Sequence, residues 1–183
     1  MRRIAQGMAA VLVVAAVGSA AAQKTTEVHP GKGGSPHVRT EWTIDGANIS
    51  IEYGRPSLKG RPETGPGFME NGKPWRTGAD EATVIKTDKP LKFGTLSLEP
   101  GTYTLNTEPG EKGWQLLVGK LGKPGQWGVP YNATLEIGRS PMSVTTAKTP
   151  VEQLNISIDD TPKGGSLKVE LGTKVVTIPF TVG

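Results

Sequence analysis

The chain has 183 residues, a formal net charge of +4 and no cysteine. Without disulfides, its stability must come from a packed core and from backbone hydrogen bonds. The lysines and arginines are scattered among acidic residues. This distribution excludes the basic stripe that is typical of nucleic-acid-binding proteins, and we expect no nucleic-acid partner.

The first 22 residues have the pattern of a signal peptide. Arg2 and Arg3 form a positive start, residues 8–17 form an apolar run, and three alanines precede Gln23. The run is too short to span a membrane, and small residues are typical before a cleavage site. We therefore expect an exported protein, periplasmic or extracellular, whose mature chain begins at Gln23 and has no membrane anchor. The remaining length suits one domain.

Residues 23–36 are polar and rich in glycine, which predicts a flexible leader. Apolar and polar residues then alternate, as in β-strands with one buried face. Residues 38–44 and 47–53 flank Asp45-Gly46, a strong signal for a two-residue hairpin turn. This hairpin places Trp42 opposite Ile49.

Further alternating stretches continue to the end of the chain, with turn residues between them. Two later turns, at 100–101 and 172–173, are also expected to form hairpins. The pairs that they predict are Leu98 with Tyr103 and Val169 with Val176. No amphipathic helix is expected after the signal peptide. The sequence therefore predicts an all-β domain over residues 37–183, a single antiparallel β-sandwich of jelly-roll-like type.

A long stretch between two predicted strands, residues 53–83, is rich in glycine and proline and has almost no periodicity. Loops of this length inside a domain are usually functional or disordered. This loop ends in a dense group of polar side chains. The candidate ligand-binding residues are Arg55, Arg61, Trp75, Arg76, Asp80 and Glu81.

The residue types in this loop suggest two roles. Arginine side chains are planar forks that match carboxylates and phosphates, and Trp75 could stack on a sugar or on a guanidinium. The alternative is a structural network. For the arginine cluster taken by itself we favour this alternative, in which Arg76 is mostly buried and bonded to Asp80 or Glu81. Such a network would tie the loop 54–74 to the sandwich, because a buried guanidinium must be paired.

Catalytic and metal sites find less support in the sequence. Asp80 and Glu81 are adjacent, so in a strand they would point to opposite faces, unlike the paired acid and base of a glycosidase. His29 and His37 are not expected to form a metal site, because His29 lies in the predicted flexible leader and zinc needs three or four converging ligands. No cofactor is expected.

Several short motifs together resemble one bacterial family. They are Ser35-Pro36, Tyr53-Gly-Arg-Pro56, Lys59-Gly-Arg61, Trp75-Arg-Thr-Gly-Ala79, Glu81-Ala-Thr83, Pro100-Gly-Thr-Tyr103, and Trp127-Gly128 before Tyr131. Over nearly all of its mature length the chain resembles the bacterial domain of unknown function family 2911, which implies a secreted protein of no established activity. Asp80 stands where the family leads us to expect Asn, and Leu171 where it leads us to expect Trp. The resemblance implies no catalytic residues.

Three functions are compatible with the sequence. The first, which we prefer, is a non-enzymatic binding module for a small anionic or saccharide ligand. The second is a hydrolase of glycans or esters with Asp80 or Glu81 as its carboxylate. The third is a structural or interaction domain without a small-molecule site. Convergence of the candidate residues on a hollow would favour binding, and a second carboxylate about 5–10 Å across a cleft would favour hydrolysis.

Overall fold

The computed structural model describes residues 23–31, 33–111, 113–122 and 131–183. The signal peptide predicted for residues 1–22 lies outside the described residues, as does Trp127 of the family motif.

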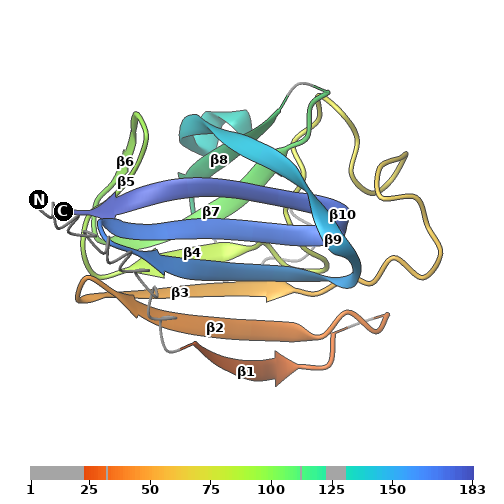
Figure 1. Ribbon diagram of the computed structural model, residues 1–183, viewed down its shortest axis with the longest axis horizontal. Helices are drawn as coiled ribbons and strands as arrows, with labels where there is room; N and C mark the ends of the chain where they lie inside the picture. Colours follow the sequence, from red (N-terminus) through yellow and green to blue (C-terminus); the bar gives the residue numbers. More distant parts are fainter. Residues whose placement is uncertain (1–22, 32, 112, 123–130) are drawn as a thin grey trace, which may run out of the picture.

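The described chain is built almost entirely from β-strands (Figure 1), so the expected all-β class is confirmed. The strands are β1 (Lys24–His29), β2 (His37–Ile44), β3 (Ala47–Gly54), β4 (Val84–Thr87), β5 (Leu91–Phe93), β6 (Leu96–Leu98), β7 (Gly101–Glu108), β8 (Trp114–Lys120), β9 (Glu136–Thr161) and β10 (Gly164–Val182). One short 3₁₀ helix, η1 (Ala133–Leu135), precedes β9. Among the described residues, no helix has the length and apolar character needed to cross a membrane.

The strands form one antiparallel hydrogen-bonded ladder in the order β1-β2-β3-β4-β7-β8-β9-β10-β5-β6. The first part of β9 pairs with β8, and β10 pairs along β9 before its end pairs with β5. The long strands β9 and β10 also contact β2 across the core. The ladder therefore bends over itself into two facing layers, and β9 and β10 cross the front of the molecule in Figure 1.

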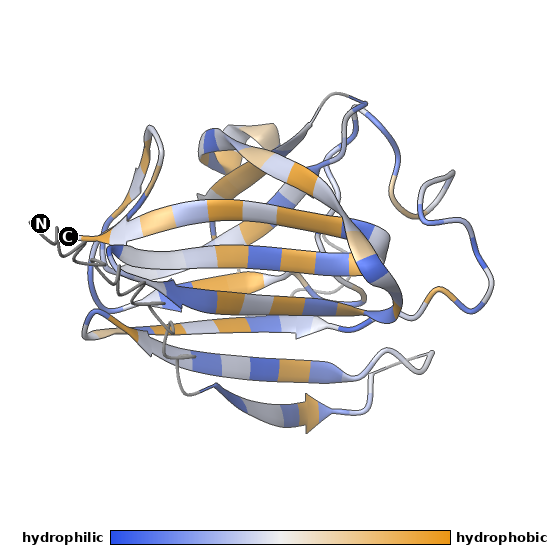
Figure 2. Ribbon diagram, in the orientation of Figure 1, coloured by the Kyte–Doolittle hydropathy of each residue, from blue (hydrophilic) through white to orange (hydrophobic). Residues whose placement is uncertain are grey.

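Alternation along the strands decides which face is buried. In β2 the side chains of Val38, Trp42 and Ile44 are buried, whereas those of Arg39 and Glu41 are exposed. Figure 2 shows the same alternation of apolar and polar positions along other strands. Buried side chains from both layers pack into one core cluster, which includes Trp42, Ile49, Ile51, Ile85, Leu105, Leu116, Leu154, Ile156, Leu167, Val169, Val176 and Ile178.

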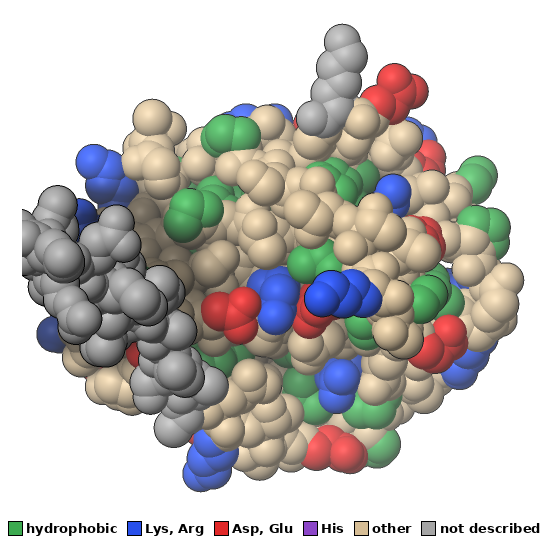
Figure 3. Space-filling view, viewed as in Figure 1, with side chains coloured by type: hydrophobic (Ala, Val, Ile, Leu, Met, Phe, Trp, Pro, Cys, Tyr) green, Lys and Arg blue, Asp and Glu red, His purple; other side chains and the backbone are tan. Residues whose placement is uncertain are grey.

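Charge is mixed on the outer surface. On the face shown in Figure 3, lysines and arginines lie among aspartates and glutamates and form no basic stripe. This arrangement agrees with the scattered charges of the sequence.

The first predicted hairpin is confirmed. β2 and β3 pair with Trp42 opposite Ile49 and Ile44 opposite Ala47. The two turn residues, Asp45 and Gly46, have φ values of 46° and 73°. Both therefore adopt the left-handed conformation that this tight hairpin turn requires.

The pairing expected at the Pro100-Gly101 turn is wrong. Leu98 lies opposite Leu91 in the β5–β6 hairpin, whereas Tyr103 in β7 lies opposite Ile85 of β4. The turn connects β6, at the end of the ladder, to β7, which lies between β4 and β8. The hairpin forms instead around Gly94, whose φ of 60° is in the left-handed region.

The pairing expected at the Gly172-Thr173 turn is also wrong. Val169 lies opposite Ile156 and Val176 opposite Val144, because β10 continues through this point with a shift of register. Gly172 has a φ of 59°. A glutamate of the long loop binds here, since Glu63 accepts hydrogen bonds from the backbone N–H (2.5 Å) and the hydroxyl (3.0 Å) of Thr173. The glycine therefore forms an irregularity that holds the loop rather than a hairpin turn.

The segment expected to be a flexible leader contains a strand. Residues 24–29 form β1, which pairs antiparallel with β2. Its glycines, at positions 31, 33 and 34, follow β1 and precede β2, so the glycine-rich composition belongs to the connection between the strands and not to the whole segment.

One buried hydrogen bond joins the two layers and gives a first testable prediction. The Tyr53 hydroxyl is buried and accepts a bond from the backbone N–H of Ile156 at 2.9 Å. Tyr53→Phe leaves this buried N–H without its acceptor, so it should lower the free energy of unfolding by about 1–3 kcal/mol in chemical denaturation. Tyr103→Phe is the control, because its hydroxyl donates to the Glu99 carbonyl at the surface. It should change stability by less than about 0.5 kcal/mol, and equal losses in both variants would contradict the prediction.

Candidate functional site

Two sequence motifs pack backbone against backbone at the base of the long loop. The Ala79 N–H donates to the carbonyl of Gly54 at 3.2 Å. A Cβ at position 54 would lie 2.3 Å from the Ala79 carbonyl oxygen, and one at Gly78 would lie 2.7 Å from the Thr83 hydroxyl. Only glycine permits this approach at residue 54, so the motif around Gly54 fixes the position of residues 79–81.

The backbone beside this contact is strained. Thr77 has a φ of 53° and Asp80 a φ of 63°. Positive φ is unusual for a β-branched residue, and Thr77 is held by hydrogen bonds from its buried hydroxyl to the Trp75 carbonyl (3.2 Å) and with the Thr107 hydroxyl (2.9 Å). Asp and Asn tolerate this conformation better than other side chains. The position therefore suits both the Asp80 found here and the Asn that the family resemblance led us to expect.

Two of the six predicted site residues anchor the loop. The Arg55 Nε donates to the carbonyl of Leu154 in β9 at 3.0 Å. Trp75 is 6% exposed and packs edge-on against Phe68 and Trp114, with ring centroids 5.7 and 6.5 Å away. These contacts tie the loop to the sandwich through Arg55 and Trp75.

Four of the predicted residues, Arg61, Trp75, Arg76 and Asp80, line one hollow of ≈ 240 Å³. We call it the arginine hollow. The Arg61 guanidinium donates to the carbonyls of Leu58 (3.1 Å) and Ser57 (2.7 Å). It also lies 4.5 Å from the centroid of the Phe68 ring, which lines the same hollow. Backbone acceptors and a ring face therefore fix the orientation of Arg61.

Arg76 agrees with its expected state only in part, since it bonds to Asp80 but through the main chain. It is half-buried rather than mostly buried, and its Nη1 donates to the backbone carbonyl of Asp80 at 2.7 Å. The Glu81 carboxylate, the other expected partner, faces His29 and His37. Arg76 therefore braces the turn at residues 76–80 through a main-chain contact.

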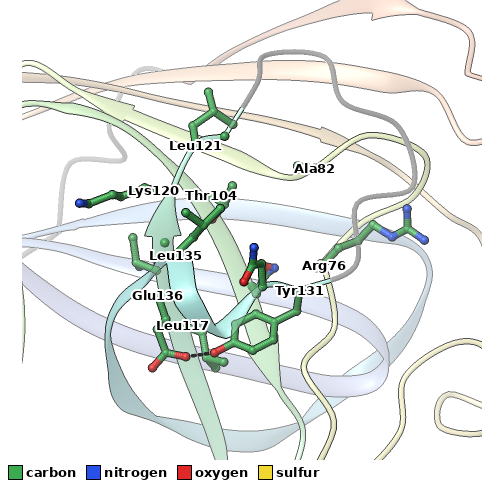
Figure 4. Close-up of a pocket in the computed structure, with 14 residues that line it drawn as sticks. Arg76, Ala82, Thr104, Leu117, Lys120, Leu121, Tyr131, Leu135 and Glu136 are labelled. Carbon is green, nitrogen blue, oxygen red and sulfur yellow. Dashed lines mark hydrogen bonds between the residues drawn. The ribbon is translucent and has the colours of Figure 1, made fainter.

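Arg76 also lines a smaller cavity of ≈ 60 Å³ (Figure 4). The Arg76 guanidinium extends away from Tyr131 and Glu136, which also line it. The Tyr131 hydroxyl donates to Glu136, and Arg139 donates to the same carboxylate at 2.9 and 2.7 Å. The bonds from Arg139 hold the pKa of Glu136 below its usual range, while burial, followed by the bond to Glu136, raises the pKa of Tyr131. A cavity of this size holds only a few waters.

A second group of side chains, which the sequence did not predict, lies beside the arginine hollow. It consists of His29, His37 and Glu81, and we call it the histidine–glutamate cluster. The register of β1 against β2 shifts between Glu27 and His29, so that His29 lies directly opposite His37. Val28 is thus the extra residue of a β-bulge, a feature that often re-aims side chains near functional sites.

The cluster is compact. The two imidazole rings stack with centroids 4.8 Å apart and an angle of 5° between their planes. One oxygen of Glu81 lies 3.3 Å from the His29 Nε2, and the other lies 3.2 Å from the His37 Nδ1. Potential ligand atoms of the three residues all lie within 4.8 Å of one another. The expectation that these histidines form no metal site rested in part on a flexible His29, whereas the structure places His29 at the end of β1, opposite His37.

His37 is buried although it belongs to the outer face of the sheet. It alternates with the inward-facing Val38 along β2 and is only 3% exposed. Its Nε2 lies 3.4 Å from a carboxylate oxygen of Glu52, which Arg39 binds at 2.9 Å. A hollow of ≈ 270 Å³ adjoins the cluster and is also lined by Val28, Glu52, Val84 and Leu121.

This geometry argues against the glycosidase hypothesis. Glu52 and Glu81 line the same hollow, but they contact the two nitrogens of the same His37 ring. The imidazole therefore lies between the carboxylates, where a scissile bond would have to lie. Asp80 lines the arginine hollow instead.

Residues 35–180 match the family model described as Protein of unknown function (DUF2911). The chain belongs to this family. The match covers most of the chain and confirms the resemblance seen in the sequence motifs. No curated protein and no solved structure matches the chain. Membership of this family therefore defines residues 35–180 as a domain but indicates no reaction.

The close approach at Gly54 gives a second testable prediction. Gly54→Ala drives a Cβ against the Ala79 carbonyl, so the free energy of unfolding should fall by about 1–3 kcal/mol or more. Gly65→Ala is the matched control in the same loop. An added Cβ there meets nothing within 4 Å, and the backbone is outside the left-handed region. This control should be neutral or stabilise by about 0.4–1 kcal/mol, and a tolerated Gly54→Ala would show that the approach is not a constraint.

The lowered pKa of Glu136 gives a third prediction. Because the folded-state pKa lies below the ordinary value of 4.5, this carboxylate stabilises the fold above that value. The stabilisation is lost as the pH falls through the folded-state pKa. Glu136→Gln should therefore lose less stability between pH 7 and pH 3 than the wild type, measured as the midpoint of urea unfolding. Glu27→Gln, on the exposed part of β1, should follow the wild type, and identical acid profiles for all three proteins would contradict the prediction.

Proposed function

We propose that the chain is an exported, non-enzymatic binding domain that takes a small anionic or saccharide ligand in the arginine hollow. One observation carries the proposal: Arg61, Trp75, Arg76 and Asp80, predicted from the sequence as site residues, line the same hollow. Their convergence is the arrangement that distinguishes a binding module from residues scattered along a loop.

The hollow offers both kinds of hydrogen-bonding group. Arg61 and Arg76 provide guanidinium donors, Asp80 provides a carboxylate acceptor, and Ser35 also lines the hollow. A sugar acid or another small polyhydroxylated anion needs this combination, because its carboxylate accepts bonds from arginine and its hydroxyls bond in both directions. The volume of ≈ 240 Å³ is suited to a ligand the size of a monosaccharide.

Preorganisation supports the same proposal. The Arg61 and Arg76 side chains are oriented by backbone carbonyls, so little side-chain freedom is lost when a ligand binds. The strained backbone at Asp80 lies at the edge of the same hollow, and strained residues tend to cluster at binding sites. A domain exported by the predicted signal peptide would meet such ligands outside the cytoplasm.

The structural alternative uses the same contacts. Arg55, Arg61 and Arg76 all bond to main-chain carbonyls, so each also stiffens the loop. A useful test must therefore separate lost ligand affinity from lost stability.

The fourth prediction supplies this test. The chain from Gln23 onward is titrated by calorimetry with glucuronate, galacturonate, glucose and inorganic phosphate at millimolar concentrations, and its Tm is measured with each. A ligand at 100 times its Kd should stabilise the fold by about 2.7 kcal/mol. Arg61→Ala should weaken that binding at least about tenfold, because a charge-assisted hydrogen bond contributes about 1.5–3 kcal/mol.

Lys73→Ala is the matched control. Lys73 carries the same charge in the same loop, pairs with Glu70 at 2.5 Å, and does not line the hollow. It should leave the affinity unchanged. A panel without any Tm shift, or an Arg61→Ala variant that loses stability but keeps ligand affinity, would favour the structural alternative.

A further inference from the structure

We propose that His29, His37 and Glu81 bind a divalent transition-metal ion of the zinc class, in a site separate from the arginine hollow. Two imidazoles and one carboxylate form a ligand set that suits zinc and neighbouring divalent ions, since nitrogen and carboxylate oxygen are their ordinary ligands in proteins. The three residues come from the end of β1, the start of β2 and the end of the long loop. Their convergence is therefore a product of the tertiary fold.

The distance from the carboxylate to each imidazole is close to the distance between two ligands of one ion. Tetrahedral ligands at about 2.0–2.1 Å from zinc lie about 3.3–3.4 Å from one another. Here the Glu81 oxygens lie 3.3 Å from the His29 Nε2 and 3.2 Å from the His37 Nδ1. The carboxylate thus lies at a ligand-to-ligand separation from each imidazole, through a different oxygen for each ring, and a movement of His29 is needed to bring both rings to one ion.

The centre of the cluster also holds buried polar atoms without a hydrogen bond. The His37 Nδ1 and the Glu81 Oε2 are both buried and face each other at 3.2 Å, yet neither makes a hydrogen bond of acceptable geometry. Leaving such atoms unsatisfied is costly. A cation between them would satisfy both lone pairs at once, which a hydrogen bond of poor angle does not.

The surroundings of His37 match those of a metal ligand. A ligating histidine usually donates its other ring N–H to a carboxylate, which fixes its orientation. The His37 Nε2 lies 3.4 Å from Glu52, and Arg39 binds that glutamate at 2.9 Å. Glu52 therefore acts as a positioning residue that leaves the Nδ1 of His37 free to ligate.

Binding requires one movement, of the His29 ring. The His29 Nδ1 now accepts a bond from the Gly31 N–H at 3.1 Å, which places the proton of the neutral ring on Nε2, facing Glu81. The stacked rings of His29 and His37 must also tilt apart. The nitrogen lone pairs of two parallel imidazole rings lie in parallel planes and cannot both point at one ion. Rotation of His29 away from the Gly31 amide meets both needs, and the side chain is 37% exposed, so it has room to turn.

Three protein ligands leave a coordination position for water or another small molecule. The adjoining hollow of ≈ 270 Å³ provides space for it. The site is therefore of the open kind, which exchanges a ligand at the metal, rather than of the closed structural kind.

The fifth prediction tests this site directly. The chain from Gln23 onward is stripped with EDTA, dialysed and titrated with Co²⁺, whose visible absorption reports coordination by nitrogen and oxygen, and then with Zn²⁺ in competition. We expect saturation at one ion per chain and a rise in Tm with Zn²⁺, since an ion that binds only the folded state stabilises it. Affinity should fall as the pH falls, because protons compete for both imidazoles and for the carboxylate.

Matched variants assign the ligands. His29→Ala and Glu81→Gln should each weaken Zn²⁺ binding at least about 100-fold, and Glu52→Gln, which removes the partner of His37, by about 10–100-fold. Glu27→Gln on the same strand and Arg61→Ala in the arginine hollow should bind Zn²⁺ as the wild type does. His29 is partly exposed, so its variant should keep the wild-type Tm in EDTA.

Two outcomes would overturn the proposal. One is a wild-type chain with no Co²⁺ absorption and no Zn²⁺-dependent rise in Tm, which would leave the cluster as a set of imidazole–carboxylate ion pairs. The other is Zn²⁺ binding that survives unchanged in both His29→Ala and Glu81→Gln. Because Arg61→Ala is a control here, failure of this site leaves the proposed ligand at the arginine hollow untouched, and the reverse also holds.

Discussion

The close approach of Gly54 to Ala79 is the constraint on which the functional region depends. It joins the end of β3 to the end of the long loop with no room for a side chain, and it sets where residues 79–81 leave the sandwich. Asp80 then borders the arginine hollow, while Glu81 faces the histidines. One backbone contact thus divides two adjacent acidic residues between two sites of different chemistry.

Local sequence patterns predicted many of the strands, but they missed β1 and were insufficient for several connections. Alternation and the Asp45-Gly46 turn predicted the β2–β3 pairing, because hairpin chemistry and burial agree there. At Gly172 the left-handed residue is part of an irregularity bound by Glu63, far away in the sequence. A glycine signal reports the backbone conformation of one residue, and only the tertiary contact decides whether the chain reverses or continues.

The candidate sites show the same division. The arginine hollow was predictable in part, because Arg61, Trp75, Arg76 and Asp80 are close in sequence within one irregular loop. The histidine–glutamate cluster was not, since Glu81 is far from both histidines in the chain. A signal for the histidines did exist: a glycine-rich turn separates two polar stretches with a histidine at each end. Interpreted as a hairpin, it would have placed the histidines near each other.

The β-bulge at Val28 decides whether His29 and His37 lie on the same face of the sheet. In a regular ladder each step along the chain moves a side chain to the opposite face, and the extra residue brings His29 into line with His37. The chemistry of this corner therefore depends on the number of residues in β1 as much as on their identity. During divergence, a single inserted or deleted codon upstream of the turn could abolish or create such a pair while every functional side chain stayed in the sequence.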